Sequence, residues 1–238
     1  MTLARKITAE GIGTMLLLAG VVGSGIMGDR LSGGNVAIAL LANTLANGAT
    51  LVAIILAFGP ISGAHFNPVV TLAVAWEGGL RRREVLGYIV GQTIGALAGV
   101  AAAHLMFGEP VFQTSQHIRA GWGQVFSEFI ATFGLLSIIW GCSRVRSGAV
   151  PFAVGAYIMG AYWFTASTSF ANPAVTLARS FTNTFSGIRP MDAPGFIAAQ
   201  LVGAIAATFL WAWLMPSLPK TAEDVVMSHS ERVRTHAR

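Results

Sequence analysis

The chain has 238 residues, of which 54% are hydrophobic and only 11% are charged, and it contains 28 glycines. Soluble domains carry about 25% charged residues, so the composition indicates an integral membrane protein. The single cysteine excludes a disulfide framework, no Cys/His cluster has the spacing of a metal site, and the net charge of +5 forms no nucleic-acid-binding stripe. We therefore expect no metal, no cofactor and no nucleic-acid partner.

The first half of the chain contains three long apolar segments and one short one. A helix needs about 20 apolar residues to cross a bilayer, so the short segment is not a span. Arg5 and Lys6 precede the first segment, but Glu10 intrudes and no cleavage site follows, so we expect a retained span rather than a signal peptide. The expected elements are a basic start over Met1–Ala9, spans over Gly11–Met27 and Asn35–Phe58, a break at Gly59-Pro60, an irregular stretch Ile61–Phe66, a half-helix over Val69–Trp76, a loop from Arg81 and a span over Val85–Phe107.

A polar connector, Gly108–Gly121, separates this half from a second one of the same design. The expected elements of the second half are spans over Trp122–Cys142 and Ala149–Thr165, an irregular stretch Ala166–Ala171, a half-helix over Val175–Phe181, a loop over Ser186–Pro194 and a span over Gly195–Met215. Residues 219–238 are expected to form a polar cytoplasmic tail. The sequence thus predicts one all-α membrane domain over residues 1–238, with six transmembrane helices and two re-entrant half-helices.

Both half-helices begin with Asn-Pro, in Asn67-Pro68-Val69 and in Asn172-Pro173-Ala174. Asparagine is a preferred helix N-cap and proline is favoured at the first helical position, so either motif alone predicts only an ordinary helix start. Other pairs recur in the same order in both halves, namely Glu-x-x-x-Thr at Glu10 and Glu128 and Gln-x-x-Gly-Ala at Gln92 and Gln200. Because each repeat (about 10–107 and 122–215) has three spans, the second copy must be inverted, which indicates a site at mid-membrane.

The basic residues predict which side each loop faces, because cytoplasmic loops carry an excess of lysine and arginine. With both termini in the cytoplasm, the outer side receives four basic residues, Arg30, Arg119, Arg179 and Arg189. The cytoplasmic side receives the other eleven, Arg5, Lys6, Arg81, Arg82, Arg83, Arg144, Arg146, Lys220, Arg232, Arg234 and Arg238. We expect a multi-pass protein of a bacterial-type inner membrane with both termini inside.

From Glu10 to Met215 these motifs resemble the aquaporin (major intrinsic protein) family. The resemblance is carried by Ser62–Thr71, Asn172–Thr176 and both sets of Glu and Gln repeats. It implies two half-helices that meet head to head at mid-membrane, a pore in every subunit and a homotetramer. The expected partners are therefore the lipid bilayer, water, small neutral solutes and further copies of the chain.

The physics of two opposed half-helices predicts a pore that excludes cations. Non-helical backbone at membrane depth must be buried in protein or line water, so the irregular stretches, with Gly63, Ala64 and His65, are expected to present carbonyl oxygens to the solute. The positive helix N-termini meet at the centre, and the amides of Asn67 and Asn172 donate hydrogen bonds there. Protons and other cations are repelled.

The family resemblance also implies a narrow filter outside the Asn-Pro centre. Carried over by spacing, its four positions are Asn47, Gly160, Ser169 and Val175. Water channels typically have an aromatic residue, a histidine, a small residue and an arginine there. Glycine and valine at the second and fourth positions predict a wider, neutral filter. Arg179 lies one helical turn beyond Val175, about 6 Å, and is either a displaced charge at the pore mouth or a headgroup arginine without a selective role.

A wide filter without arginine favours neutral solutes larger than water. The segment Ser167–Arg179 is similar to aquaporin-like channels of bacterial arsenic-resistance systems. The hypothesis is passive conduction of small neutral polyhydroxy solutes, such as undissociated arsenite or glycerol, together with water. No nucleophile with a base converges in a pocket, so an enzyme is not expected. The alternatives are a water-selective channel, a poorly conducting structural protein and a proton-coupled secondary transporter.

The role of the two buried acids differs between the transporter hypothesis and the channel hypothesis. Glu10 and Glu128 are expensive in lipid and need partners. A carrier would use them as a proton relay, whereas their symmetric placement favours a structural brace that accepts loop N–H groups. His65 next to the pore has two readings, a pH gate or a residue that orients the loop.

Overall fold

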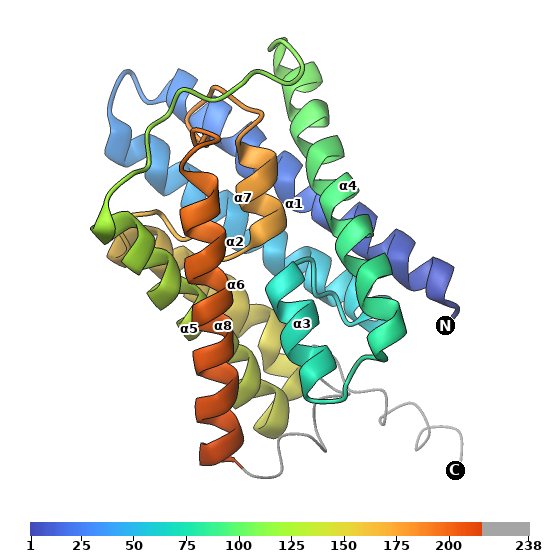
Figure 1. The fold of residues 1–238 in the computed structure, drawn as a ribbon. Helices are drawn as coiled ribbons and strands as arrows, with labels where there is room; N and C mark the ends of the chain where they lie inside the picture. The colour runs from blue at the N-terminus through green and yellow to red at the C-terminus, as the bar shows by residue number, and fades with distance from the viewer. Residues whose placement is uncertain (216–238) are drawn as a thin grey trace.

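The computed structural model describes residues 1–215, which contain helices and connecting segments but no strand. Six long helices cross one another at a tilt, and two short helices, α3 and α7, lie among them (Figure 1). The elements are α1 (Leu3–Leu31), α2 (Val36–Ser62), α3 (Pro68–Trp76), α4 (Arg82–Phe107), α5 (Trp122–Val145), the 3-10 turn η1 (Ser147–Ala149), α6 (Val150–Phe164), α7 (Pro173–Arg179) and α8 (Ala193–Leu214). The predicted fold of six spans and two half-helices is confirmed.

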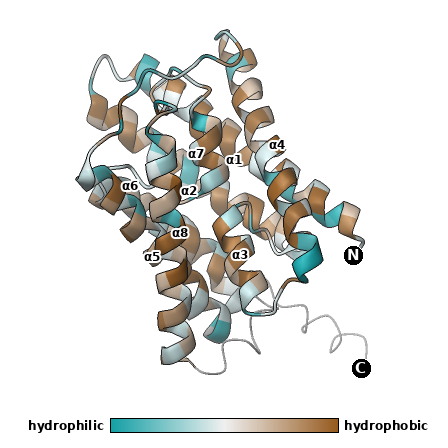
Figure 2. Ribbon diagram, viewed as in Figure 1, coloured by the Kyte–Doolittle hydropathy of each residue, from teal (hydrophilic) through white to brown (hydrophobic). Residues whose placement is uncertain are grey.

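Five of the long helices, α1, α2, α4, α5 and α8, have the length and apolar composition to cross a membrane. Apolar residues cover most of their length, and polar residues gather towards the helix ends and turns (Figure 2). The sixth, α6, has only 15 residues, about 22 Å. It follows η1 almost directly, and the two together extend to about 28 Å, close to the hydrocarbon thickness.

Several predicted boundaries were wrong. α1 begins at Leu3 rather than Gly11, because Thr2 caps it by accepting a hydrogen bond from the Arg5 N–H, and the helix then runs on through Glu10. α2 does not stop at Gly59-Pro60 but continues to Ser62. It ends where Gly63 takes a left-handed conformation with φ of 91° and donates its N–H to the Gly59 carbonyl.

Three other helix ends also differ from the prediction. α4 includes Arg82 instead of starting at Val85, α5 reaches Val145, and α7 stops at Arg179. The connector Gly108–Gly121 contains no helix, as predicted. The expected tail over 219–238, with its basic residues, lies outside the described residues.

The two halves pack alike through glycines on the Gln helices. α1 packs against α4, and α5 packs in the same way against α8. A Cβ atom at Gly95 would lie 2.1 Å from the Gly11 carbonyl oxygen, and one at Gly203 would lie 2.6 Å from the Phe129 carbonyl oxygen. Only glycine permits these backbone approaches, so the recurring Gln-x-x-Gly motif sets the spacing within each half.

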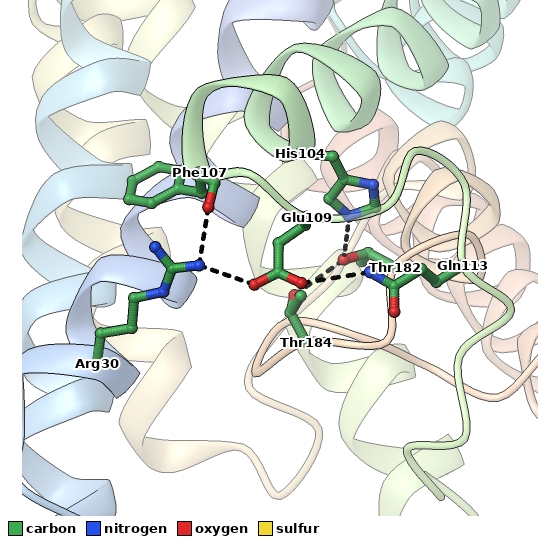
Figure 3. A network of polar contacts seen from close by, with 7 residues as sticks. All are labelled: Arg30, His104, Phe107, Glu109, Gln113, Thr182 and Thr184. Carbon is green, nitrogen blue, oxygen red and sulfur yellow. Dashed lines mark hydrogen bonds and ion pairs between the residues drawn. The ribbon is translucent and has the colours of Figure 1, made fainter.

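The connector and residues 180–192 lie at one end of the bundle, which we call the connector face. Polar contacts hold the connector in place (Figure 3). Arg30 at the end of α1 pairs with Glu109 at 2.9 Å and also donates to the Phe107 carbonyl. His104 of α4 contacts the Thr182 hydroxyl at 2.8 Å, which joins α4 to the segment after α7. The face around the second half-helix is therefore built by both halves.

Candidate pore

Two irregular stretches, residues 63–66 and 165–171, meet between the long helices. Non-glycine residues in them have positive φ at matching places, 48° for Ala64 and 52° for Ser169, and 49° for both Phe66 and Ala171. Such conformations cost free energy and prevent helix formation. Within the described residues, no protein group donates to the carbonyls of residues 63–65 or of their counterparts 168–170. Four of these residues, Ala64, His65, Ser169 and Phe170, also line a cavity, so their backbone oxygens are available to a solute.

The two asparagines of the Asn-Pro motifs cross-link the stretches. Asn67 Nδ2 donates to the Ala171 carbonyl and Asn172 Nδ2 donates to the Phe66 carbonyl, both at 2.8 Å. Each Oδ1 caps its own half-helix, with Asn67 accepting from the Val69 N–H at 3.1 Å and Asn172 from Ala174 and Val175. Pro68 and Pro173 occupy the first helical position. Each amide nitrogen keeps one further N–H.

The two buried acids lie behind the irregular stretches. Glu10 accepts four hydrogen bonds, from the Ser62 hydroxyl, the N–H groups of His65 and Phe66, and Gln92, at 2.6 to 3.0 Å. Glu128 accepts three, from the N–H groups of Phe170 and Ala171 at 2.8 Å and from Gln200 at 2.6 Å. Both carboxylates are fully buried. Their oxygens are occupied by loop donors, which is the geometry that a brace needs.

Two glutamines complete the support of the loops. Gln92 Nε2 also donates to the Thr71 hydroxyl at 2.9 Å, and Gln200 Nε2 to the Thr176 hydroxyl at 2.8 Å. Each Gln thus ties a carboxylate to a half-helix. The sequence signalled this role only through the recurrence of the Gln motif. His65 contacts the Thr71 hydroxyl through Nδ1 at 3.1 Å and lies against the Tyr88 ring.

A cavity runs past both stretches and is lined by the candidate pore residues. Its polar lining includes Asn47, His65, Asn67, Tyr162, Ser169, Asn172 and Arg179, and Ala64 and Val175 also contact it. The remaining wall is apolar and mostly aliphatic, from Phe66, Phe170, Ala171, Leu17, Val21, Leu51, Ile55, Val70, Leu135, Ile139, Val150, Val154 and Ile158. Gly63 and the motif residues Val69 and Ala174 do not line it. Among residues 1–215, no aspartate or glutamate lines the cavity.

Of the four predicted filter positions, Asn47, Ser169 and Val175 line the cavity and Gly160 does not. Gly160 is exposed and lies off the cavity, and a Cβ there would approach only Phe164, at 3.9 Å. The cavity residues of α6 recur every four positions and end at Tyr162. Two residues are a rotation of about 200° on a helix, the opposite face. Spacing counted back from Asn172 cannot fix this rotation, because residues 165–171 are not helical.

Tyr162 instead joins Asn47 across the cavity. Asn47 Nδ2 donates to the Tyr162 hydroxyl at 2.7 Å. In the described residues, Asn47 Oδ1 and the Ser169 hydroxyl have no protein partner although both are buried. Buried polar groups are rarely left unpaired, so an acceptor, a hydroxyl and the free Tyr162 proton together offer hydrogen bonds to a hydroxylated solute.

Two arginines flank Phe170 near the connector face, and sequence reasoning singled out only one of them. Arg179 is 2% exposed, lines the cavity and lies with its guanidinium carbon 3.4 Å from the centre of the Phe170 ring. Arg119, from the connector, is 5.0 Å from the same ring. Burial lowers the pKa of Arg119 to about 10, so it stays protonated at neutral pH.

The arrangement of two opposed half-helices, each braced by a buried acid, within six tilted helices defines a transmembrane channel. The family model described as major intrinsic protein matches residues 1–165 and 140–237. The chain therefore belongs to the major intrinsic protein family, whose members are channels and not enzymes.

Similar proteins cover about nine tenths of the chain. It is 55% identical over 218 residues to the aquaglyceroporin AqpS of Rhizobium meliloti strain 1021, a match that spans 91% of this chain and 93% of the relative. It is 31% identical over 242 residues to the probable aquaporin AqpM of Archaeoglobus fulgidus, which spans 90% and 98%. The solved structure of the aquaglyceroporin from Plasmodium falciparum has a TM-score of 0.73, with 21% identity over 91% of this chain and 99% of that one, and it supports the fold.

Proposed function

We propose that this channel conducts small neutral polyhydroxy solutes, such as glycerol and undissociated arsenite, together with water. The observation that carries the proposal is Val175, which contacts the cavity at the position directly after Asn172-Pro173-Ala174. A valine removes a long side chain and its charge from the constriction. The name of the relative at 55% identity, an aquaglyceroporin, agrees with this solute class.

The polar groups of Asn47, Tyr162 and Ser169 at the cavity support hydroxylated solutes in particular. Asn47 Oδ1 and Ser169 Oγ have no protein partner in residues 1–215, and the Tyr162 hydroxyl has a proton to donate. A solute with several hydroxyl groups replaces its lost water by these contacts and by the free backbone carbonyls. Because Tyr162 rather than Gly160 contacts the cavity, the additional width in this proposal comes from Val175 and from Asn47.

The contacts of the buried acids favour a channel over a proton-coupled carrier. Glu10 and Glu128 are occupied by four and three donors. A relay would need one of these carboxylates to exchange protons with the solute path. We extend the proposal to a homotetramer in a bacterial-type inner membrane, with the connector face outside and both termini in the cytoplasm.

Proteoliposomes with Val175→Arg and Val175→Met variants test the solute class. Arginine restores length and charge, and methionine restores length alone. Val175→Arg is expected to abolish glycerol and arsenite flux while water permeability is kept, and Val175→Met is expected to lose only part of the solute flux. Wild-type flux should be non-saturating and independent of a pH gradient. Water permeation by the wild type without glycerol, arsenite or antimonite flux would overturn the proposal.

A further inference from the structure

Arg119 and Arg179 bring two positive charges to the connector-face mouth of the cavity. Both side chains are buried, at 8% and 2% exposure. Their protein acceptors are uncharged: the Gly187 and Ser167 carbonyls at 2.8 and 3.1 Å and the Thr168 hydroxyl at 3.5 Å for Arg119, and the Ser186 carbonyl for Arg179. Backbone carbonyls orient a guanidinium but do not neutralise it.

Neither charge has a carboxylate partner within residues 1–215. The ion pairs there are Lys6–Glu84, Arg81–Glu84, Arg30–Glu109 and Arg189–Asp192. Asp192 accepts from the backbone N–H of Arg119 but is already paired with the Arg189 side chain. Glu128 is engaged by three loop donors. Uncompensated buried charge costs several kcal/mol, so this pair of arginines is a binding surface for a negative ligand.

Arg179 retains the donors that such a ligand needs. Its Nε donates to the Ser186 carbonyl, and this is the only hydrogen bond that the Arg179 side chain makes within residues 1–215, so both terminal nitrogens keep their donors. The side chain contacts the cavity, and stacking on Phe170 fixes the plane of the guanidinium. A planar fork of free N–H groups matches two oxygens of a carboxylate or a tetrahedral oxyanion.

We propose that the connector-face mouth holds a binding site for a small singly charged oxyanion, contacted by Arg179 and attracted by Arg119 behind Phe170. The shared chemistry is an anionic pair of oxygens, on a carboxylate or on a tetrahedral oxyanion. The anion stays at the mouth, because the aliphatic wall deeper in the cavity, including Val70, Val154 and Ile158, offers nothing to replace its water. A bound anion therefore competes with neutral solutes that enter from this face.

Equilibrium binding to the purified full chain in nanodiscs tests the site without relying on conduction. The probes are sodium acetate and sodium dihydrogen phosphate, titrated against sodium chloride at equal ionic strength. Saturable binding of one or both is expected, and the two arms separate a carboxylate site from a tetrahedral one. Arg179→Gln is expected to weaken the affinity by about tenfold or more, since a charged hydrogen bond contributes about 1.5–3 kcal/mol.

Arg30→Gln is the matched control, because it removes a positive charge from the same face that is already paired with Glu109. It should leave the affinity within about twofold, a few tenths of a kcal/mol. If Arg179→Gln fails to fold, Arg119→Gln and Arg179→Lys decide, and both should weaken binding. No saturable binding to the wild type, or unchanged affinity in the folded arginine variants, would overturn the site. Neither result bears on which neutral solute is conducted.

Discussion

The two halves of the channel share their supports but differ in what they present to the cavity. Counterparts in the irregular stretches and half-helices lie 105 residues apart, so Asn67 matches Asn172 and Thr71 matches Thr176, and each pair makes the same contacts. The other matched positions differ in chemistry. Ala64, His65 and Val74 of the first half correspond to Ser169, Phe170 and Arg179 of the second.

The comparison divides the residues around the cavity into two groups. The residues that recur hold the backbone, and the residues that depart from the repeat supply the polar and cationic groups near the connector face. Val70 and Val175 are an instructive exception, because the repeat is kept at a position where the family resemblance leads one to expect arginine in the second half only. The absence of arginine makes the two halves more alike than in a water channel.

Removal of the braces should have the largest effect on stability. Glu10→Ala removes an acceptor from four donors and Glu128→Ala from three, and in each case two of these donors are loop N–H groups. Each buried polar group without a partner costs about 1–3 kcal/mol, so both variants should lose several kcal/mol, with Glu10→Ala the worse. The yield of monodisperse protein and its unfolding temperature measure this. Equal losses would show that the extra donor of the first half contributes nothing.

Substitution of the glycines at the helix crossings should have the next largest effect on stability. Gly95→Ala places a Cβ 2.1 Å from a backbone oxygen of α1, and Gly203→Ala places one 2.6 Å from a backbone oxygen of α5. Overpacking costs about 1–3 kcal/mol, and the closer contact should cost more. Thermal unfolding of both variants, with Gly123→Ala as a control that meets nothing within 4 Å, checks the order.

Tyr162→Phe should have a smaller effect on stability and a clear one on flux. It removes the acceptor of Asn47 Nδ2, and a typical hydrogen bond contributes about 0.5–1.5 kcal/mol to stability. Glycerol flux is expected to fall relative to water permeability. Gly160→Ala, on the face of α6 away from the cavity, should change neither. A reversal of these two results would support the assignment of Gly160 to the filter.

The smallest expected effect is the pH dependence of stability from His117 in the connector. The His117 residue is exposed, but partial desolvation lowers its pKa below the usual 6.5, and the charges of Arg119 and Arg179 lower it further. The folded state therefore resists protonation, so stability is full above pH 6.5 and falls as the unfolded state binds the proton at lower pH. His117→Gln should flatten the dependence of the unfolding temperature on pH between about 7 and 5. An unchanged slope would exclude His117 as its source.

The sequence predicted the fold and the centre of the pore because those features depend on residues that recur. The Asn-Pro, Glu and Gln pairs recur in the sequence, and they lie in or directly behind the two irregular stretches. The position of Gly160 off the cavity could not be predicted, because the rotation of α6 depends on the non-helical segment that follows it, where counting residues does not give direction. Arg119 was assigned only to an outer loop, since nothing local to the connector shows that it folds back over Phe170.

The exchange of hydrogen bonds between Asn67 and Asn172 also constrains how the chain is made. The Asn67 amide finds its acceptor 104 residues further along the chain, and the Phe66 carbonyl finds its donor 106 residues further along. During synthesis the first re-entrant segment must therefore wait, with polar groups unsatisfied, until most of the second half has entered the membrane. Neither half can satisfy the hydrogen bonds of its own irregular stretch. A fragment that ends at the connector is therefore expected not to fold stably in the membrane.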